Sequence, residues 1–245
     1  MGTTTSARSD RMRSGRYHAI RQARRRRLRQ RFAGGVLLTV ILAVAVVLVI
    51  RSRSSDAVPA FELVHEAYAG IPISGRALGD SAAPVTVVEY GDYQCPGCGY
   101  FARELEGQLV RDYVETGKVH FEFRDYAFIG NESKAAAEAA ACAADQDVFW
   151  QFHATLYRSQ MGENMGGFGQ KRMKAMASGL GMDGDRFAKC VNQQSHADDV
   201  DRMRAEARTK GVTGTPSFVV NGVLIEYAGY ESLRVAIDAA LEAKS

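Results

Sequence analysis

Residues 85–101, VTVVEYGDYQCPGCGYF, place two cysteines between a predicted strand and a predicted helix. The apolar run at 85–90 has the β-branched bias of a buried strand, and Gly91 with Asp92 ends it. Beyond the cysteines, apolar residues recur at steps of three and four, which is typical of the buried face of a helix: Phe101, Leu105, Leu109 and Val110. A strand, a turn with C-x-x-C and a helix together predict a dithiol redox centre.

The two cysteines of this motif, Cys95 and Cys98, are expected to have different roles. A thiol at the start of a helix faces unpaired backbone N–H groups and the positive end of the helix dipole, which favour its thiolate. The thiolate is the nucleophile in disulfide exchange. Pro96 suits the first helical turn, because its missing N–H would be unpaired there. We therefore predict that Cys95 is the exposed, attacking thiol and that Cys98 is the buried, resolving thiol.

A C-x-x-C pair can also be half of a zinc site. Such a site needs two more Cys or His ligands at short spacing, and the sequence has no second C-x-x-C and no H-x-x-x-H. Acidic residues are too scattered to indicate another metal. The glycine-rich stretch GENMGGFG at 162–169 lacks the strand-then-helix setting of a phosphate loop. We therefore predict no metal site, and nothing in the sequence indicates an organic cofactor.

The net charge of +3 conceals a strong asymmetry along the 245 residues, a length that allows one large or two small domains. Residues 1–32 hold eleven arginines and one acidic residue, Asp10, whereas the remainder holds 20 Lys and Arg against 27 Asp and Glu. The run RRRR at 24–27 could bind nucleic acid, but the apolar segment that follows it favours a different role. No nucleic-acid partner is therefore expected.

That segment, FAGGVLLTVILAVAVVLVI at 32–50, has nineteen residues and no charge. A helix of this length spans roughly 28 Å, close to the hydrocarbon thickness of a bilayer. The preceding arginines fit the positive-inside rule, with the amino terminus in the cytoplasm and the rest of the chain outside. We predict a single-pass anchor in the cell membrane. A cleaved signal peptide that ends near 58–60 and a buried helix of a soluble protein are the alternatives.

The rest of the chain has strand and helix patterns in alternation. Residues 118–125, KVHFEFRD, alternate apolar and polar positions, as a strand with one buried face does. Trp150 and His153 lie in a mainly helical region and are interpreted as packing residues. Asn221-Gly222 predicts a hairpin turn. The predicted helices lie at 61–68, 133–144, 148–159, 171–180, 183–194, 197–210 and 230–243, and the hairpin strands at 217–220 and 223–227.

Four stretches, APVTVVEYGDYQCPGC, FEFRDY, CAADQDVFWQFH and GVTGTPSFVVNG, resemble the DsbA-like thiol:disulfide oxidoreductases of the thioredoxin superfamily, in particular their membrane-anchored type. The resemblance extends from about residue 73 to the carboxyl end. It implies an α/β thioredoxin fold with an inserted helical domain, preceded here by one transmembrane helix. The expected parts are a tail at 1–31, the anchor at 32–50, a linker at 51–70, the thioredoxin domain at 71–130 and 198–245, and the insert at 131–197.

The resemblance also assigns roles to individual residues. Cys95 and Cys98 match the catalytic pair, and Pro216 matches a cis-proline that faces it, with Thr215 before it. The turned backbone of Thr215 is expected to pair with an extended substrate strand; a trans-proline that begins the next strand is the alternative. Glu89 lies where the superfamily has a buried acid that exchanges a proton with the resolving thiol. An ordinary strand glutamate paired with a lysine is the alternative for Glu89.

Two departures from the family pattern bear on the chemistry. The stretch Asp125-Tyr126-Ala127 lacks a proline that many relatives have, so the loop facing the site is expected to differ. Pro-Gly stands between the cysteines, without the histidine of the most oxidising members. A histidine there could donate a hydrogen bond to the thiolate, whereas Gly97 has no side chain to do so. We therefore predict a less oxidising centre than theirs.

Cys142 and Cys190 lie 48 residues apart in the expected insert. Unpaired thiols are unusual outside the cytoplasm, and an even count suggests pairing; relatives have cysteines in both contexts. We predict a structural disulfide, with two separate buried cysteines as the alternative.

The leading functional hypothesis is an oxidase that introduces disulfides into reduced secreted proteins. Such an enzyme needs a membrane partner that returns electrons to quinone, of the DsbB or vitamin-K-epoxide-reductase (VKOR) type, and an anchor raises the effective concentration of the two. A reductase or isomerase is the second hypothesis. A tethered holdase that binds unfolded chains without redox turnover is the third.

Overall fold

The computed structural model describes residues 39–48 and 58–244. By its contacts the chain divides into two units, Met1–Ala57 and Val58–Ser245. In the first unit, residues 39–48 form a helix. No helix within the described ranges is long and apolar enough to cross a membrane. The predicted tail, the outer parts of the predicted anchor and residues 51–57 of the predicted linker lie outside the described residues, so the anchor stays a prediction.

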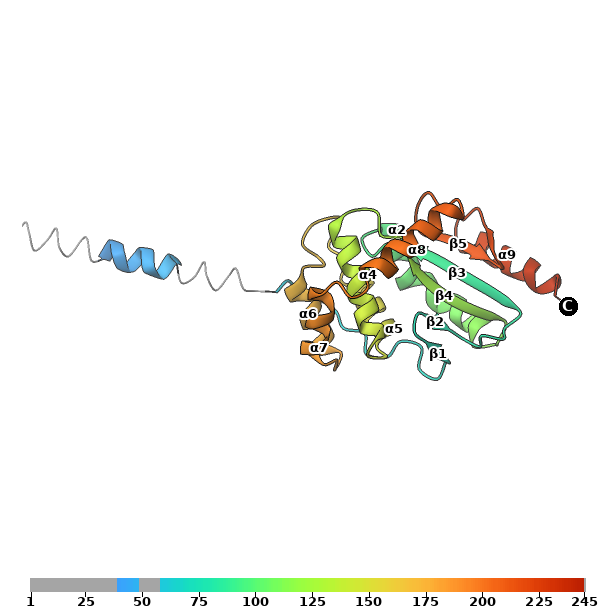
Figure 1. Ribbon diagram of the computed structural model, residues 1–245, viewed down its shortest axis with the longest axis horizontal. Helices are drawn as coiled ribbons and strands as arrows, with labels where there is room; N and C mark the ends of the chain where they lie inside the picture. The colour runs from blue at the N-terminus through green and yellow to red at the C-terminus, as the bar shows by residue number, and fades with distance from the viewer. Residues whose placement is uncertain (1–38, 49–57, 245) are drawn as a thin grey trace, which may run out of the picture. The chain divides into compact units, whose positions relative to one another are not determined.

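The second unit is built on a six-stranded sheet with the order β1-β2-β4-β3-β5-β6 (Figure 1). The two long central strands, β3 (Val85–Gly91) and β4 (Val119–Asp125), are parallel, and every other pairing is antiparallel. The short outer strands are β1 (Ile73–Ser74), β2 (Ala77–Leu78), β5 (Ser217–Val220) and β6 (Val223–Leu224). The parallel β3–β4 pair requires a helical crossover, and the chain segment after the two cysteines supplies it.

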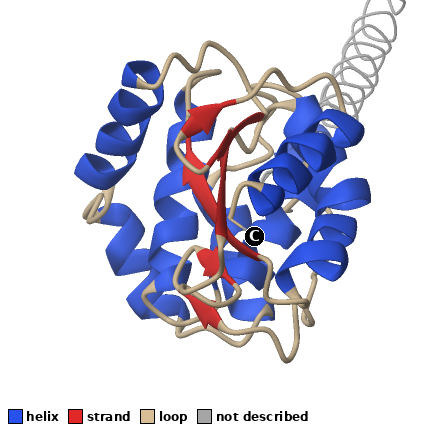
Figure 2. Cartoon of the chain, turned by 90° about the vertical axis from the view of Figure 1, so that its right-hand side faces the viewer, coloured by secondary structure: helices blue, strands red, loops and turns tan. Residues whose placement is uncertain are grey.

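Helices cover both faces of this sheet (Figure 2). Because successive side chains of a strand point to opposite faces, β3 contributes to two apolar clusters. Val85 and Val87 belong to the main core, whereas Val88 and Tyr90 pack on the other face with Val219. The main core therefore lies on the face of the sheet toward which the Glu89 side chain also points.

The crossover after the cysteines is one continuous helical run with two π-helical turns in it. Its parts are α2 (Pro96–Tyr100), η1 (Phe101–Leu105), α3 (Glu106–Leu109) and η2 (Val110–Val114). Of the apolar positions predicted to face the core, Phe101, Leu109 and Val110 are buried, and Leu105 is half-buried against it. The run ends at Val114, and Gly117 in the turn that follows has a φ of +70°, a conformation that glycine adopts without strain.

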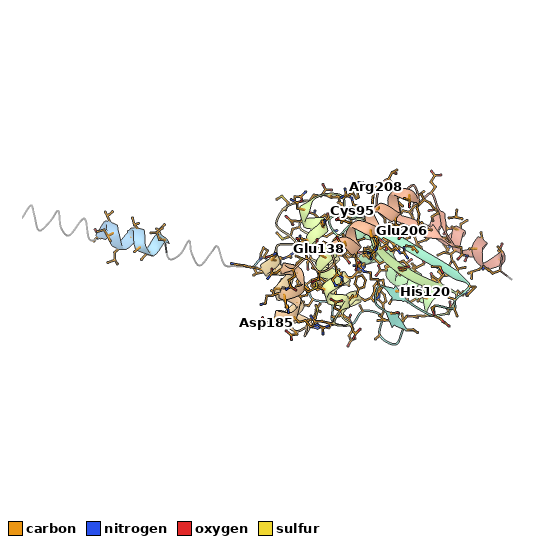
Figure 3. The ribbon with its side chains drawn as sticks, viewed as in Figure 1. Cys95, His120, Glu138, Asp185, Glu206 and Arg208 are labelled. Atoms are coloured by element: carbon orange, nitrogen blue, oxygen red, sulfur yellow. A yellow bond between two sulfur atoms is a disulfide. The ribbon has the colours of Figure 1, made fainter. Side chains whose placement is uncertain are left out.

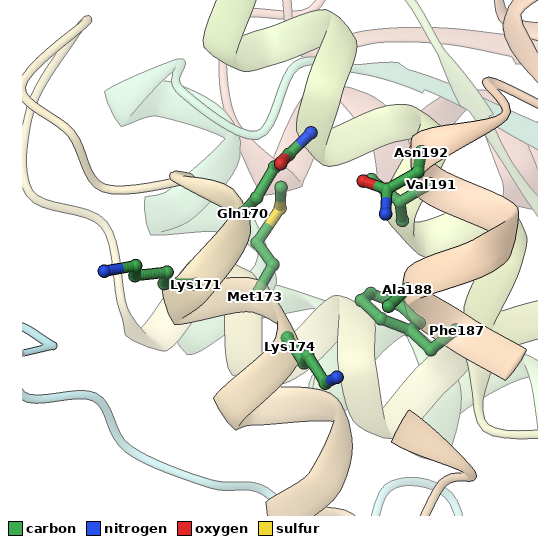
Figure 4. Close-up of a pocket in the computed structure, with 8 residues that line it drawn as sticks. All are labelled: Gln170, Lys171, Met173, Lys174, Phe187, Ala188, Val191 and Asn192. Carbon is green, nitrogen blue, oxygen red and sulfur yellow. The ribbon is translucent and has the colours of Figure 1, made fainter. Parts of the chain in front are cut away.

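The helical insert follows β4 and contains most of the predicted helices. They are α4 (Asn131–Ala144), α5 (Phe149–Arg158), α6 (Gln170–Gly179) and α7 (Gly184–Asn192); α8 (Ala197–Thr209) begins at the last residue of the expected insert, and α9 (Tyr230–Glu242) is the last helix. Cys142 on α4 and Cys190 on α7 are joined by a disulfide. An apolar cavity lies between α6 and α7 (Figure 4), and none of its lining residues belongs to the C-x-x-C turn.

Two predicted elements are wrong. Residues 61–68 form no helix, and two of their backbone N–H groups are bound by side chains of the insert. The Val64 N–H donates to Thr155 Oγ1 at 3.0 Å, and the Glu62 N–H donates to Ser159 Oγ at 3.3 Å. The second hairpin strand is also shorter than predicted. It ends at Leu224, after which the chain turns so that the Tyr227 ring packs on Phe218 with centroids 4.7 Å apart.

Candidate active site

Cys95 lies between the end of β3 and the start of α2 (Figure 3). It is the N-cap residue of α2, in extended conformation, with Pro96 as the first helical residue. Cys95 is partly exposed, whereas Cys98, one turn further along, is fully buried, and both are free thiols. The two sulfurs therefore have the exposures predicted for an attacking and a resolving thiol.

The two thiols differ strongly in acidity. The pKa of Cys95 is lowered to about 6, chiefly by the hydrogen bond from the Cys98 thiol and further by Thr215 and the backbone N–H groups at the helix start. The pKa of Cys98 is raised well above its ordinary value, first by burial and then by the same hydrogen bond to Cys95. At neutral pH the pair therefore holds one thiolate, at Cys95, and one proton, at Cys98.

A cis peptide bond between Thr215 and Pro216 lies directly against this turn. The Cys95 sulfur is 3.3 Å from the Thr215 carbonyl oxygen. A Cβ atom on Gly97 would be 3.2 Å from Pro216 Cδ and 3.8 Å from the Thr215 carbonyl oxygen. Gly97 therefore matters in two ways. It has no side chain that could donate a hydrogen bond to the thiolate, and its small size lets the C-x-x-C turn approach Pro216 closely.

Glu89 lies on β3, with Phe123 and Phe218 as its register partners on the two adjacent strands. It is fully buried, and neither carboxylate oxygen has a hydrogen-bond partner among the described residues. The alternative of an ion pair with lysine therefore does not apply. The pKa of Glu89 is raised well above its ordinary value by burial, then by the charges of Glu106 and Cys95. A protonated, unpaired carboxyl so placed can serve as a proton donor.

Asp92 organises the loops around the dithiol, a role that the sequence analysis did not assign. One carboxylate oxygen accepts hydrogen bonds from the Gln94 N–H at 2.8 Å and from Ser133 Oγ at 2.6 Å. The other accepts from the N–H groups of Phe128 at 2.9 Å and Ile129 at 3.1 Å. The only local signal was an aspartate just after a strand, which is common in turns. Three of its four partners are distant in sequence.

The insert also contacts the dithiol turn through the loop at 160–169. Gln160 Nε2 donates to the backbone oxygens of Tyr93 at 2.8 Å and of Cys95 at 3.0 Å. Arg103, on the crossover, donates to Gln160 Oε1 at 3.2 Å. This side chain therefore fixes the backbone on which the attacking thiol sits, and no pattern in the sequence indicated it.

A row of four buried or half-buried polar side chains runs behind the dithiol. Tyr68 donates a hydrogen bond to Glu106 Oε1, and His153 Nε2 lies 3.3 Å from Glu106 Oε2. On its other side, His153 Nδ1 is 3.1 Å from the Tyr93 hydroxyl. His153 is fully buried, as expected of a packing residue, but it also bonds on both sides of its ring.

The loop after β4 lacks the proline of many relatives, and its own contacts fix its position. Asp125 forms a buried ion pair with Arg76, and the Tyr126 N–H donates to the Gly91 oxygen at 2.8 Å. The Tyr126 ring packs on Phe128, with centroids 5.1 Å apart. The loop is thus held to the end of β3 by a backbone bond.

The second cysteine pair offers no free metal ligand. Donor atoms of Cys142, Cys190 and His196 lie within 4.8 Å of one another. The two sulfurs, however, are bonded to each other, and His196 Nε2 is 2.8 Å from Asp145 Oδ2. The disulfide joins α4 to α7 within the insert, which fits a structural role.

A parallel β3–β4 pair with a C-x-x-C helix start that faces a cis-proline is the arrangement of thioredoxin-class dithiol proteins. Comparison with known proteins agrees with this class. A family model described as thioredoxin matches residues 73–239. The probable disulfide bond formation protein D of Bacillus anthracis is 32% identical over 171 residues, 68% of this chain and 78% of that protein. The disulfide bond formation protein D of Bacillus subtilis is 31% identical over 195 residues, 74% of this chain and 84% of that protein.

Among solved structures, oxidised BdbD from Bacillus subtilis superposes with a TM-score of 0.65 at 27% identity, covering 70% of this chain and 96% of that one. The chain therefore belongs to the thioredoxin family, within its DsbA-like, BdbD-like disulfide oxidoreductases. It is a thiol:disulfide oxidoreductase that acts on proteins, and the predicted thioredoxin fold with a helical insert is confirmed.

Proposed function

We propose that the protein is an oxidase, which transfers the Cys95–Cys98 disulfide to reduced secreted proteins. The observation that carries the proposal is the low pKa of Cys95, about 6. A stabilised thiolate stabilises the reduced enzyme, and an enzyme with a stable reduced form gives its disulfide away readily. Because no histidine stands between the cysteines, we expect the reduction potential to be lower than that of the most oxidising relatives, but still in the range of an oxidase.

The reaction consists of two thiol–disulfide exchanges. A substrate thiolate attacks Cys95 Sγ, the Cys95–Cys98 bond breaks, and Cys98 leaves as a thiolate that takes up a proton. The second thiolate of the substrate then attacks the substrate sulfur that is bonded to Cys95 in the mixed disulfide, and Cys95 leaves as a thiolate. The substrate loses two electrons to the enzyme dithiol. Glu89 is the proposed donor of the proton to Cys98, because it is buried, protonated and without another partner.

The surroundings of Cys95 suit an extended, partly apolar substrate. The Thr215 backbone, turned by the cis bond, offers hydrogen bonds to a peptide laid beside Cys95. Large apolar side chains are exposed on the segments that Asp92 and the dithiol turn hold in place. They are Tyr100 on α2, Phe128 in the loop after β4, and Met161 and Met165 in the loop at 160–169. Flexible methionines adapt to varied partners, which an enzyme with many protein substrates requires.

The proposal places the dithiol outside the cytoplasm, with residues 32–50 as a membrane anchor. It is supported by the apolar, uncharged sequence of that segment and by the arginines before it. A quinone-linked reoxidase of the DsbB or VKOR type is the proposed partner that removes two electrons from the reduced dithiol. Anchoring both proteins in one membrane raises the effective concentration of each for the other.

The reduction potential of Cys95–Cys98 tests the proposed direction. After equilibration with glutathione buffers, we expect a value near or above about −180 mV, in the range of proteins that donate disulfides. A value near about −270 mV would indicate a reductase and overturn the oxidase proposal. Cys95→Ser is the control for the holdase hypothesis, since it abolishes disulfide transfer and leaves binding of an unfolded chain unchanged if binding alone is the function.

A further inference from the structure

The carboxyl of Glu89 shares one face of the sheet with a second buried acid, Glu106. Glu89 is paired in register with Phe123 on β4. The Phe123 ring lies 4.6 Å from the His153 ring, and His153 Nε2 is 3.3 Å from Glu106 Oε2. Glu106 is 1% exposed, and Glu89 and His153 are 0% exposed. Two acids in one region buried from solvent interact strongly, because charges there are poorly screened.

The hydrogen bonds around Glu106 define its protonation state. Tyr68 donates to Oε1, so that oxygen accepts. The Tyr93 hydroxyl has His153 Nδ1, 3.1 Å away, as its one hydrogen-bond partner among the described residues, so we assign this hydroxyl as the donor. That assignment puts the ring proton of His153 on Nε2, which faces Glu106 Oε2. Glu106 thus has a donor on each oxygen and no acceptor, which is the pattern of a carboxylate. Glu89 has no hydrogen-bond donor within the described part of the chain. Of the two acids, Glu106 is therefore the one that holds the negative charge.

We propose that Glu106, held by Tyr68 and His153, is a positioning residue whose fixed negative charge keeps Glu89 protonated and ready to donate to Cys98. The two carboxyls cannot both ionise cheaply in this region, so the charge at Glu106 retains the proton at Glu89. When Cys98 leaves as a thiolate, the Glu89 proton moves to Cys98 Sγ. The negative charge stays buried at Glu89 until that carboxylate is reprotonated from water.

Other titratable groups face this cluster, and they do not replace Glu106 in this role. Besides the two thiols, they are Tyr68, Arg76, Asp92, Tyr93, Asp125, His153, Tyr157 and Tyr227. Of the two further carboxylates, Asp125 is neutralised by its ion pair with Arg76, and Asp92 accepts four hydrogen bonds from the surrounding loops. The pKa values of Tyr68, Tyr93 and Tyr157 are raised well above 10.0, mainly by burial, so these tyrosines stay neutral. The pKa of Glu89 is raised by burial first and by Glu106 second.

The test is the pH dependence of the rate at which one dithiol, dithiothreitol, reduces the oxidised enzyme. The reaction is stopped with acid, and free thiols are counted by alkylation and mass spectrometry. Wild type loses rate at high pH when Glu89 loses its proton. In Glu106→Gln this loss moves to lower pH, so the variant-to-wild-type ratio is near 1 at about pH 5 and falls to about one tenth by about pH 8. A ratio that is flat with pH overturns the proposal.

Two further variants keep the test decisive if Glu106→Gln folds poorly. Tyr68→Phe removes one donor from Glu106 and keeps the ring that packs on Trp150 with centroids 5.5 Å apart. It should move the profile in the same direction by a smaller amount. Tyr113→Phe is the matched control, because Tyr113 donates to Asp238 at 2.8 Å, away from the dithiol. An equal shift in Tyr113→Phe, or none in Tyr68→Phe, contradicts the proposal.

This inference rests on dithiol exchange at Cys95 and Cys98, and its failure is distinguishable from failure of the oxidase proposal. The oxidase proposal depends on the value of the reduction potential at one pH. The role of Glu106 depends on how the rate changes with pH, in either direction of exchange. A reductase-like potential together with a shifted pH profile therefore overturns the oxidase proposal and leaves the role of Glu106 standing. An oxidase-like potential with an unshifted profile overturns the role of Glu106 and leaves the oxidase proposal standing.

Discussion

The Cys95 thiolate owes its stability more to the neighbouring thiol than to any charged side chain. The largest cause of its low pKa is the hydrogen bond from Cys98, and no basic side chain is among the causes. The bond exists only in the reduced enzyme, because the disulfide removes both the donor and the charge. The pKa is about 6 in the folded protein against 9.0 ordinarily. The reduced fold therefore gains stability as pH rises from about 6 toward 9, and loses it as pH falls through 6.

Substitution of the resolving cysteine tests this explanation of the Cys95 pKa. Cys98→Ala removes the donor, so the midpoint of Cys95 ionisation should rise clearly above 6. Cys98→Ser keeps a hydroxyl donor in the same place and should hold the midpoint closer to that of wild type. Thiolate absorbance in the ultraviolet, followed against pH in the reduced protein, measures both. Equal midpoints for the two variants would assign the low pKa to the helix start instead.

At the scale of elements, the insert depends on one covalent cross-link between α4 and α7. The Cys142–Cys190 disulfide closes a loop with a sequence separation of 48. In the chain-entropy model, a cross-link over a loop of this length stabilises the fold by about 4 kcal/mol. Because α5, α6 and the loop at 160–169 lie between the two cysteines, the constraint also includes the residues that fix the backbone of Cys95.

The double variant Cys142→Ala/Cys190→Ala should therefore lose about 4 kcal/mol of the free energy of unfolding. Urea unfolding of the variant and wild type measures the loss, with Cys95→Ser/Cys98→Ser in both chains so that only one disulfide is compared. A loss below about 1 kcal/mol would mean that helix packing alone holds the insert together.

The sequence contained enough to predict the elements and the dithiol, but not the side chains that support them. The C-x-x-C motif, the cis-proline and Glu89 are local patterns or family positions, and the helices follow from apolar periodicity. Asp92 and Gln160 act through partners up to 67 residues away, which only the folded chain brings together. The helix predicted at 61–68 is also absent, and the N–H groups of Glu62 and Val64 bind side chains that are more than 90 residues away in the sequence.

At the scale of the molecule, one buried arginine binds the start of the segment before β1 to the insert, in addition to the bonds of Glu62 and Val64. Arg172 donates to the backbone oxygens of Pro59 at 3.1 Å and Ala60 at 2.6 Å. It also donates to the backbone oxygen of Ser159 at 2.9 Å and to that of Gly167, in the loop at 160–169, at 2.6 Å. The expected linker is thus docked from about residue 59 onward, and burial without a carboxylate partner lowers the pKa of Arg172.

Arg172→Gln should release both the segment before β1 and the loop at 160–169. A lost charge-assisted hydrogen bond costs about 1.5–3 kcal/mol, so the free energy of unfolding should fall by at least about 2 kcal/mol. Hydrogen exchange of the amides in both segments should rise together. Arg202→Gln, at an exposed arginine, is the matched control and should change neither. Faster exchange in one segment alone would show that Arg172 does not couple them.

The chain has a single tryptophan, and its position gives the protein a built-in optical probe of the dithiol's surroundings. The Trp150 indole is fully buried, its N–H has no partner among the described residues, and its ring lies 5.1 Å from His153 and 5.5 Å from Tyr68. Selective excitation of this one fluorophore therefore samples the residues that hold Glu106. A blue-shifted emission that changes in intensity when the disulfide is reduced would allow every turnover to be followed without a label.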